Sequence, residues 1–507
     1  MNLNKIFKEW GWTIFILFVI SGIGLGIRLY NLTILPVFVD EAIYVRWSQV
    51  MAIEPTLRFL PLSDGKQPLF MWVLMFLIKY FSDPLFVGRL ISVGTGMGTI
   101  LGVFTLSYLL FKNKKTAVVA TLLYTVSPFS VFFDRMALVD SMLSMFGIWT
   151  AVFGYLTAKH KRWDLAMLTG FMLGFAFLTK SPAIFVGLLL PSFWWLTGLR
   201  GIWKLGATYV IAFAMYNVQR LGPNFDMLSS RTGDYVRPLN HIFINFFDPL
   251  IPHLKDVAVW LSSFGPSAII PVVLIGAYLG FKQNFKTTIL LLGWLLVPIF
   301  IQSELALAFT ARYIYFTIPY LFILAGLVVV TDQKWLRYIG YGLITVFLVQ
   351  SSIFNFYLLT NPEKANLSRG ERSGYLEEWT AGQGIKEISE YLKNESSLID
   401  NQQIIVGTEG YFGTLPDGLQ IYVNDHPNIV VIGVGVIITE TPKSLKEAVE
   451  AGNKTYLVVN KSRFRADYEE LGYKFIAKYP KGLRLTDSDQ YAKYGPQEEL
   501  LFFEIVK

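Results

Sequence analysis

The sequence predicts a polytopic α-helical membrane protein with a C-terminal extracytoplasmic α/β domain. Of its 507 residues, 53% are hydrophobic and only 16% are charged, which excludes a disordered chain, a coiled coil and a string of ordinary soluble domains. The charges are unevenly distributed: residues 1–359 have 27 Lys and Arg against 15 Asp and Glu, whereas residues 360–507 have 17 against 22. We therefore expect a multi-span membrane domain over residues 1–359 and a soluble domain over residues 360–507.

The first apolar stretch, residues 10–30, is long enough to cross a bilayer, and Lys5 and Lys8 precede it, as in a retained signal anchor. Residues 68–81 are apolar over only about 14 positions, which favours a re-entrant or interfacial helix. Ten further stretches have the length and hydropathy of spans, giving about 11 transmembrane helices: 85–111, 116–133, 141–158, 163–180, 182–199, 202–219, 257–281, 286–303, 313–331 and 336–358.

The basic residues between these stretches set the expected orientation. If residues 68–81 do not cross, five Lys/Arg clusters lie on the same side as the N-terminus: Lys112/Lys114/Lys115, Lys159/Lys161/Arg162, Arg200/Lys204, Lys282/Lys286 and Lys334/Arg337. Since such clusters face the cytoplasm, we expect a multi-pass plasma-membrane protein with a cytoplasmic N-terminus. Residues 31–84, 220–256 and the tail are then outside. The chain has no cysteine, which excludes disulfides and Cys-based metal or redox sites but fits a prokaryotic chain as well as any compartment. We expect a prokaryotic protein.

The tail alternates strand-like and helical patterns, which indicates a small α/β domain. The expected strands cover residues 404–408, 429–436, 455–460, 473–479 and 500–506. Residues 385–394 and 444–451 are amphipathic at helical spacing. Gly382 and Gly384 form a GxG that follows no strand, so we interpret it as the turn into a helix rather than a phosphate loop.

Several charged residues stand at the outer ends of the expected spans, where hydrocarbon makes charge costly. The cations are Arg28, Lys66, Arg89, Arg135, Lys180 and Arg312, and the acidic residues are Asp40, Glu41, Asp134, Asp140 and Glu304. Each one alone could snorkel to the headgroups. Together they predict an outward-facing polar cavity, in which cations suit a lipid phosphate and carboxylates suit general-base chemistry.

The sharpest local feature is the adjacent pair Asp40-Glu41 after the first span. Neighbouring carboxylates lie about 100° apart around a helix, so one can face a cavity while the other caps the helix. A capping pair without any catalytic role is an equally ordinary interpretation.

These residues belong to a series of motifs that resembles the GT-C superfamily of polytopic glycosyltransferases. The series runs PVFVDEAIYVRWSQ, DGKQPLFMW, VGRLISVGTGMGTILGVF, SPFSVFFDRMALVDSML, FLTKSP and ARYIYFTIP, in order over residues 10–330. It is most similar to the branch of the protein O-mannosyltransferases and the lipid A aminoarabinose transferase. The tail lies outside this resemblance.

The resemblance implies roles for individual residues. Asp40, Glu41 and Asp140 match the acidic positions of the family's reaction centre, with Asp40 as the general base and Glu41 in acceptor binding or helix orientation. The donor phosphate would be bound by Arg89, Arg135, Lys66, Lys180 and Arg312. Gln67 departs from the family's Lys-Pro-Pro-Leu pattern. Gly65 replaces a carboxylate that helps some relatives to bind a metal, so no metal site is assigned, and His241 and His253 are interpreted as structural or solvated.

The sequence therefore predicts a glycosyltransferase that moves a hexose or pentose from a polyprenyl-phosphate donor to a glycolipid, polysaccharide or protein acceptor, with no required cofactor and no nucleic-acid partner. A transporter would need charged or broken helices near the bilayer midplane and an internal repeat, and the sequence shows neither. A non-catalytic receptor with a ligand-binding tail would not need the motif series. An oligosaccharyltransferase or an O-antigen ligase remains open within the enzyme class.

Overall fold

The computed structural model describes residues 3–398 and 402–506, which divide into two compact units. The helical unit comprises Met1–Leu32, Thr56–Val73 and Arg89–Ser368. The C-terminal unit comprises Thr33–Pro55, Leu74–Gly88 and Arg369–Lys507. The C-terminal unit thus includes α2 (Val39–Ile53), the helix that begins with the Asp40-Glu41 pair.

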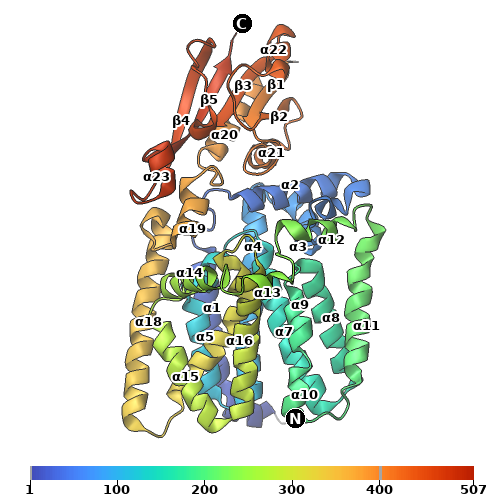
Figure 1. Cartoon of the computed structure of the whole chain (residues 1–507), viewed down its shortest axis with the longest axis vertical. Coiled ribbons are helices and arrows are strands. Elements are labelled where there is room, and N and C mark those ends of the chain that lie inside the picture. The colour runs from blue at the N-terminus through green and yellow to red at the C-terminus, as the bar shows by residue number, and fades with distance from the viewer. Residues whose placement is uncertain (1–2, 399–401, 507) are drawn as a thin grey trace. The chain divides into compact units, whose positions relative to one another are not determined.

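The helical unit is built from apolar helices (Figure 1). Its helices are α1 (Leu3–Leu29), α5 (Lys114–Val126), α6 (Pro128–Phe133), α7 (Val139–His160), α8 (Trp163–Thr179), α9 (Ala183–Leu189), α10 (Ser192–Thr197), α11 (Lys204–Asn217), α12 (Met227–Ser230), α13 (His241–Ile244), α14 (Leu250–Ser263), α15 (Ile269–Gln283), α16 (Phe285–Leu305), α17 (Ile318–Ala325) and α18 (Lys334–Thr360). The 3₁₀ turns η2 (Leu60–Asp64), η6 (Ala311–Thr317) and η7 (Gly326–Val329) connect them, and α3 (Leu69–Leu77) and α4 (Pro84–Phe111) contribute to both units.

Six helices in the described ranges are long and apolar enough to cross a membrane: Lys8–Leu29, Pro84–Phe111, Val139–His160, Phe285–Leu305, Ala311–Val329 and Lys334–Thr360. Shorter apolar helices cover other predicted spans, among them Trp163–Thr179 and Ala183–Thr197. The apolar window of Ala311–Val329 is 83% buried and that of Lys8–Leu29 only 17%, so the former is central and the latter presents an apolar surface suited to lipid. The predicted polytopic fold is confirmed.

Two predicted spans are not single helices. Residues 116–133 divide into α5 and α6, because Ser127 between them has a non-helical backbone before Pro128. Residues 257–281 do not form a single helix, because α14 ends at Ser263 and α15 begins at Ile269. Gly265 and Pro266 follow α14, and a proline ring cannot continue a helix without losing a backbone hydrogen bond. Figure 1 shows α14 lying across the direction of α16 and α18 rather than alongside them.

The C-terminal unit contains a five-stranded mixed sheet. The strands are β1 (Ile404–Glu409), β2 (Ile429–Gly435), β3 (Lys454–Asn460), β4 (Tyr473–Leu483) and β5 (Gln497–Ile505), in the order β2-β1-β3-β5-β4. β1 is parallel to β2 and β3, whereas β5 is antiparallel to β3 and β4. All five predicted strands are present, so the predicted α/β domain is confirmed.

Helices cover both faces of this sheet. Because successive side chains of a strand point to opposite faces, neighbouring residues of one strand pack against different helices. The helices of the domain are α19 (Arg369–Arg372), α20 (Ile385–Leu398), α21 (Asp417–Val423), α22 (Lys443–Glu450) and α23 (Asp489–Tyr494). Leu445 of α22 packs with Leu457 and Phe503, while Tyr391 of α20 packs with Tyr456 and Phe502 on the other face. The glycine pair of the predicted turn lies directly before α20.

Candidate active site

The two adjacent carboxylates at the start of α2 have different environments. Glu41 is buried, and its Oε2 accepts a hydrogen bond of 3.0 Å from the backbone N–H of Phe38, the residue before the helix. This contact satisfies one of the backbone donors that a helix start leaves open. Asp40 is half-buried in the same first turn, where the helix dipole favours a negative charge. Glu41 therefore caps and orients the start of the helix.

Asp140 and Lys180 form an ion pair in the helical unit, in which Asp140 is buried and Lys180 is partly exposed. Lys180 follows α8, and its Nζ lies 2.6 Å from Oδ1 of Asp140, which is in the first turn of α7. The same ammonium lies 4.5 Å from the centre of the Tyr313 ring, and the Arg312 guanidinium lies 5.6 Å from that ring. Within the described residues, Oδ2 of Asp140 is buried and has no hydrogen-bond partner. The arrangement thus combines two cations with a carboxylate oxygen that can still accept a proton or a hydrogen bond.

The segment before α3 is tied to the residue after Lys180. Gln67 donates from Nε2 to the Oγ of Ser181 at 2.8 Å, so the position that departs from the family pattern has a structural contact of its own. Lys66 pairs with Asp64 at 3.2 Å, and Asp64 also pairs with Arg231. Nothing in the sequence points to Arg231, because no local pattern links it to Asp64, which is 167 positions earlier.

Arg89 and Arg135 are both bound to the polypeptide around the end of α1. Arg89 is fully buried and donates to the carbonyl of Leu32 at 3.0 Å. Arg135 donates to the carbonyls of Ile27, Arg28, Tyr30 and Asn31 at 2.7–3.0 Å. A helix leaves its last four carbonyls without partners, and a cation is favoured there. Arg135 therefore acts as the C-cap of α1, an alternative to the phosphate contact expected from the sequence.

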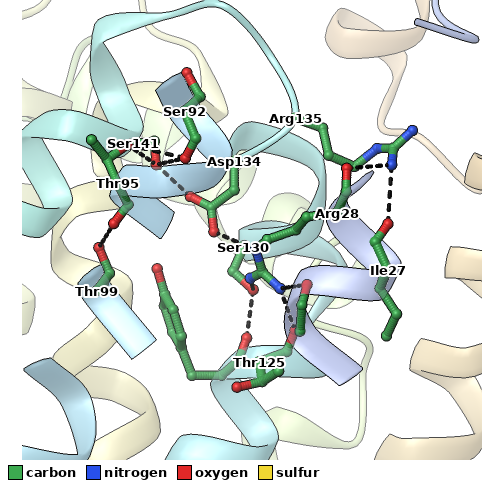
Figure 2. A network of polar contacts seen from close by, with 12 residues as sticks. Ile27, Arg28, Ser92, Thr95, Thr99, Thr125, Ser130, Asp134, Arg135 and Ser141 are labelled. Atoms are coloured by element: carbon green, nitrogen blue, oxygen red, sulfur yellow. Dashed lines mark hydrogen bonds and ion pairs between the residues drawn. The ribbon is translucent and has the colours of Figure 1, made fainter. Parts of the chain in front are cut away.

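Arg28 and Asp134 do not line an open cavity. Figure 2 shows them paired inside the helical unit, with Nε of Arg28 2.9 Å from Oδ2 of Asp134 and both side chains fully buried. Arg28 also donates to the carbonyl of Thr125 and to Ser130, while Asp134 accepts from Ser141 at 2.6 Å and from Tyr315 at 2.7 Å. The two charges neutralise each other, which is the condition for burying either one.

This network connects the segments that present the other site residues. Ser141 follows Asp140 in α7, and Tyr315 is in η6 with Arg312 and Tyr313. Thr95 of α4 donates to Ser141 at 2.9 Å (Figure 2). A Cβ at Gly96 would lie 2.3 Å from the Asp134 carboxylate, so only glycine lets α4 approach this closely. The buried pair thus fixes α7 and η6 relative to α4.

Glu304 is also buried, at the end of α16. His241 lies 3.6 Å from it through Nδ1, and Arg237 contacts the other ring nitrogen of His241 at 3.3 Å. His253 contacts the carbonyl of Ser303 at 2.8 Å, as expected for a structural histidine. In the described ranges, no three His, Asp or Glu side chains come together as a group that could hold a metal ion.

The family model for dolichyl-phosphate-mannose-protein mannosyltransferases matches residues 65–218. This match includes Lys66, Arg89, Arg135, Asp140 and Lys180, and it ends before η6. No curated protein matches the chain by sequence.

The fold is that of the GT-C membrane glycosyltransferases. ArnT from Cupriavidus metallidurans in its apo state is 15% identical over 98% of both chains, with a TM-score of 0.57. The same protein bound to undecaprenyl phosphate gives a TM-score of 0.58 at 15% identity and the same coverage. The oligosaccharyltransferase of Archaeoglobus fulgidus in complex with Zn and sulfate is 12% identical over 88% of this chain and 68% of its own, with a TM-score of 0.51. The resemblance to the GT-C superfamily is confirmed.

Proposed function

We propose that this chain is an integral-membrane glycosyltransferase that moves a sugar from a polyprenyl-phosphate donor to an acceptor outside the cytoplasm. The observation that supports it most is the Asp140–Lys180 ion pair beside Arg312, in a chain with the GT-C fold. The ArnT structure with undecaprenyl phosphate supports a lipid-phosphate ligand. The acceptor is a glycolipid, a polysaccharide or a protein hydroxyl, and the sugar is a hexose or a pentose.

In the proposed reaction, the acceptor oxygen forms a bond to the anomeric carbon as the bond from that carbon to the phosphate oxygen breaks. Asp40 takes the acceptor proton, and polyprenyl phosphate leaves. Lys180, Arg312 and Lys66 neutralise the charge that grows on the phosphate. These fixed cations supply the stabilisation that a divalent ion would otherwise give, so the proposal requires no metal. A phosphate role for Arg89 requires that its guanidinium bind the donor while it still donates to the carbonyl of Leu32.

The variant Asp40→Asn tests the general base. Asparagine keeps the size of the side chain but cannot accept a proton at neutral pH, so turnover falls by about 10²–10⁴-fold while donor binding is retained. The assay is release of polyprenyl phosphate from a panel of purified polyprenyl-phosphate hexoses and pentoses. Asp425→Asn is the matched control, because Asp425 is an exposed carboxylate of the same unit. Wild-type turnover in Asp40→Asn would contradict the assignment.

The variant Lys180→Ala tests the phosphate site. Loss of one charge-assisted contact weakens undecaprenyl phosphate binding by roughly ten- to a hundredfold. Lys282→Ala is the control, since Lys282 lies 4.5 Å from the ring of Tyr278 in the same cation–π geometry but in a predicted cytoplasmic cluster. Equal affinities of the two variants for undecaprenyl phosphate in detergent would remove Lys180 from the phosphate site.

A further inference from the structure

The start of α2 is paired with a short segment of the C-terminal domain, residues 378–382, which we name the strap. Val39 donates its backbone N–H to the carbonyl of Thr380 at 3.1 Å, and Phe38 forms an antiparallel bridge with Ala381. Gly382 lies so close that a Cβ there would be 2.7 Å from the carbonyl oxygen of Val37. The residue after Val39 is Asp40, so the strap fixes the backbone from which that carboxylate projects.

The strap is itself held by two buried cations at the end of β4. Lys481 donates from Nζ to the carbonyls of Glu378 and Ala381, at 3.1 and 2.6 Å. Arg484 binds both carboxylate oxygens of Glu378, at 2.7 and 3.0 Å, and also contacts Glu498. Both cations are almost completely buried. The two contacts of Lys481 are to main-chain oxygens, which an apolar side chain could not bind.

Burial of the charged Lys481 ammonium costs free energy, because it removes the ammonium from water. It lowers the pKa of the ammonium to about 8, although Glu409, Glu498 and Glu378 partly offset this effect. Because the folded pKa lies below the unfolded value, the contribution of Lys481 to stability is present at high pH and is lost as the pH falls through about 8. At neutral pH a well-packed apolar residue would cost less, so the hydrogen bonds to the strap are the geometric reason for a lysine here.

The rest of α2 is attached to the same domain by separate contacts. Arg46 donates to Asn424 at 2.6 Å, and Gln49 donates to the carbonyl of Ile421 at 2.8 Å. Trp47 packs against Phe412 with ring centroids 5.7 Å apart. These contacts hold the middle of the helix, so loss of the strap loosens its first turn without releasing the helix.

We infer that Lys481, together with Arg484, is a positioning residue for sugar transfer, because it holds the strap that places Asp40. This inference rests on the proposed function. It gives the C-terminal domain, which lies outside the motif series, a part in the chemistry: strand β4 sets the geometry of the catalytic carboxylate through the strap, and neither cation touches substrate.

The first experiment measures amide hydrogen exchange of the full-length protein in detergent for Lys481→Met. Losing its hydrogen bonds to the strap should speed exchange of the Val39 amide by about tenfold. Lys478→Met is the matched control, because Lys478 is in the same strand but exposed and paired with Glu499. If Val39 exchanges equally fast in the two variants, the inference is overturned. Glu378→Gln weakens the Arg484 contact without removing Lys481 and repeats the test should Lys481→Met not fold.

The second experiment measures turnover and donor affinity of the same variants. Lys481→Met should lower kcat by tenfold or more and leave the affinity for undecaprenyl phosphate unchanged, whereas a general loss of folding would lower both. Faster exchange of Val39 with unchanged kcat would overturn the positioning role. If the wild-type protein releases no polyprenyl phosphate from any donor, the proposed function fails, and the positioning role fails with it. With an active wild type, only the positioning role is at stake.

Discussion

Breaking the buried pair of Arg28 and Asp134 should destabilise the protein far more than breaking an exposed ion pair. Asp134→Asn keeps the side-chain volume and the contacts to Ser141 and Tyr315, but it removes the charge opposite Arg28. Because both side chains are fully buried, the guanidinium is then left without a counterion in a medium of low dielectric. Breaking a buried pair in this way costs about 3–5 kcal/mol.

The assay is reversible unfolding in mixed detergent micelles, followed by tryptophan fluorescence. Asp164→Asn is the matched control, since Asp164 pairs with Arg162 but both side chains are more than half exposed. Water replaces that partner, so no measurable change is expected for the control. The double variant Arg28→Met/Asp134→Asn should recover part of the loss, because it removes the uncompensated charge. Equal unfolding free energies for Asp134→Asn and Asp164→Asn would refute the reasoning.

Three further predictions concern the C-terminal unit. Burial raises the pKa of Asp417 to about 6, so the stability linked to its protonated form is present at pH 4 and lost as the pH rises through 6. Asp417→Asn should abolish this loss of about 3 kcal/mol, and parallel unfolding curves for variant and wild type between pH 4 and 8 would contradict it. Gly384→Ala should destabilise the protein by about 1–3 kcal/mol more than Gly452→Ala. Both glycines have positive φ, but a Cβ at Gly384 would lie 2.4 Å from Tyr479 and one at Gly452 meets open space, so equal melting temperatures would remove the steric argument. A reporter that is active only in the cytoplasm should stay silent when fused after Lys507, and a signal would place the tail inside.

The sequence alone determined the elements whose signal is local. Apolar stretches of sufficient length predicted the long helices, and short alternating stretches predicted the five strands, because hydrophobic periodicity is read within a few turns or a few residues. The Asp40-Glu41 pair was identified in the same way. The sequence leaves open which of the two carboxylates caps the helix. In the structure the cap is Glu41.

Only the tertiary structure decided which distant charges meet. Arg28 and Asp134 are 106 residues apart, and nothing in either segment distinguishes a pair of buried, mutually neutral groups from two residues lining a cavity. The C-capping role of Arg135 likewise depends on the end of α1 lying beside the loop after α6. Packing sets these approaches, and sequence spacing does not encode them.

The assignment of α2 is the clearest case. The hydropathy profile places its residues in an outer loop of the membrane domain, whereas the structure joins them to the C-terminal domain through Val39 and the strap. The partners of this pairing are backbone N–H and C=O groups, which every residue possesses. A contact made by groups common to all residues leaves no signature in the sequence, so the pairing of the segment before Asp40 with the strap becomes visible only in the folded chain.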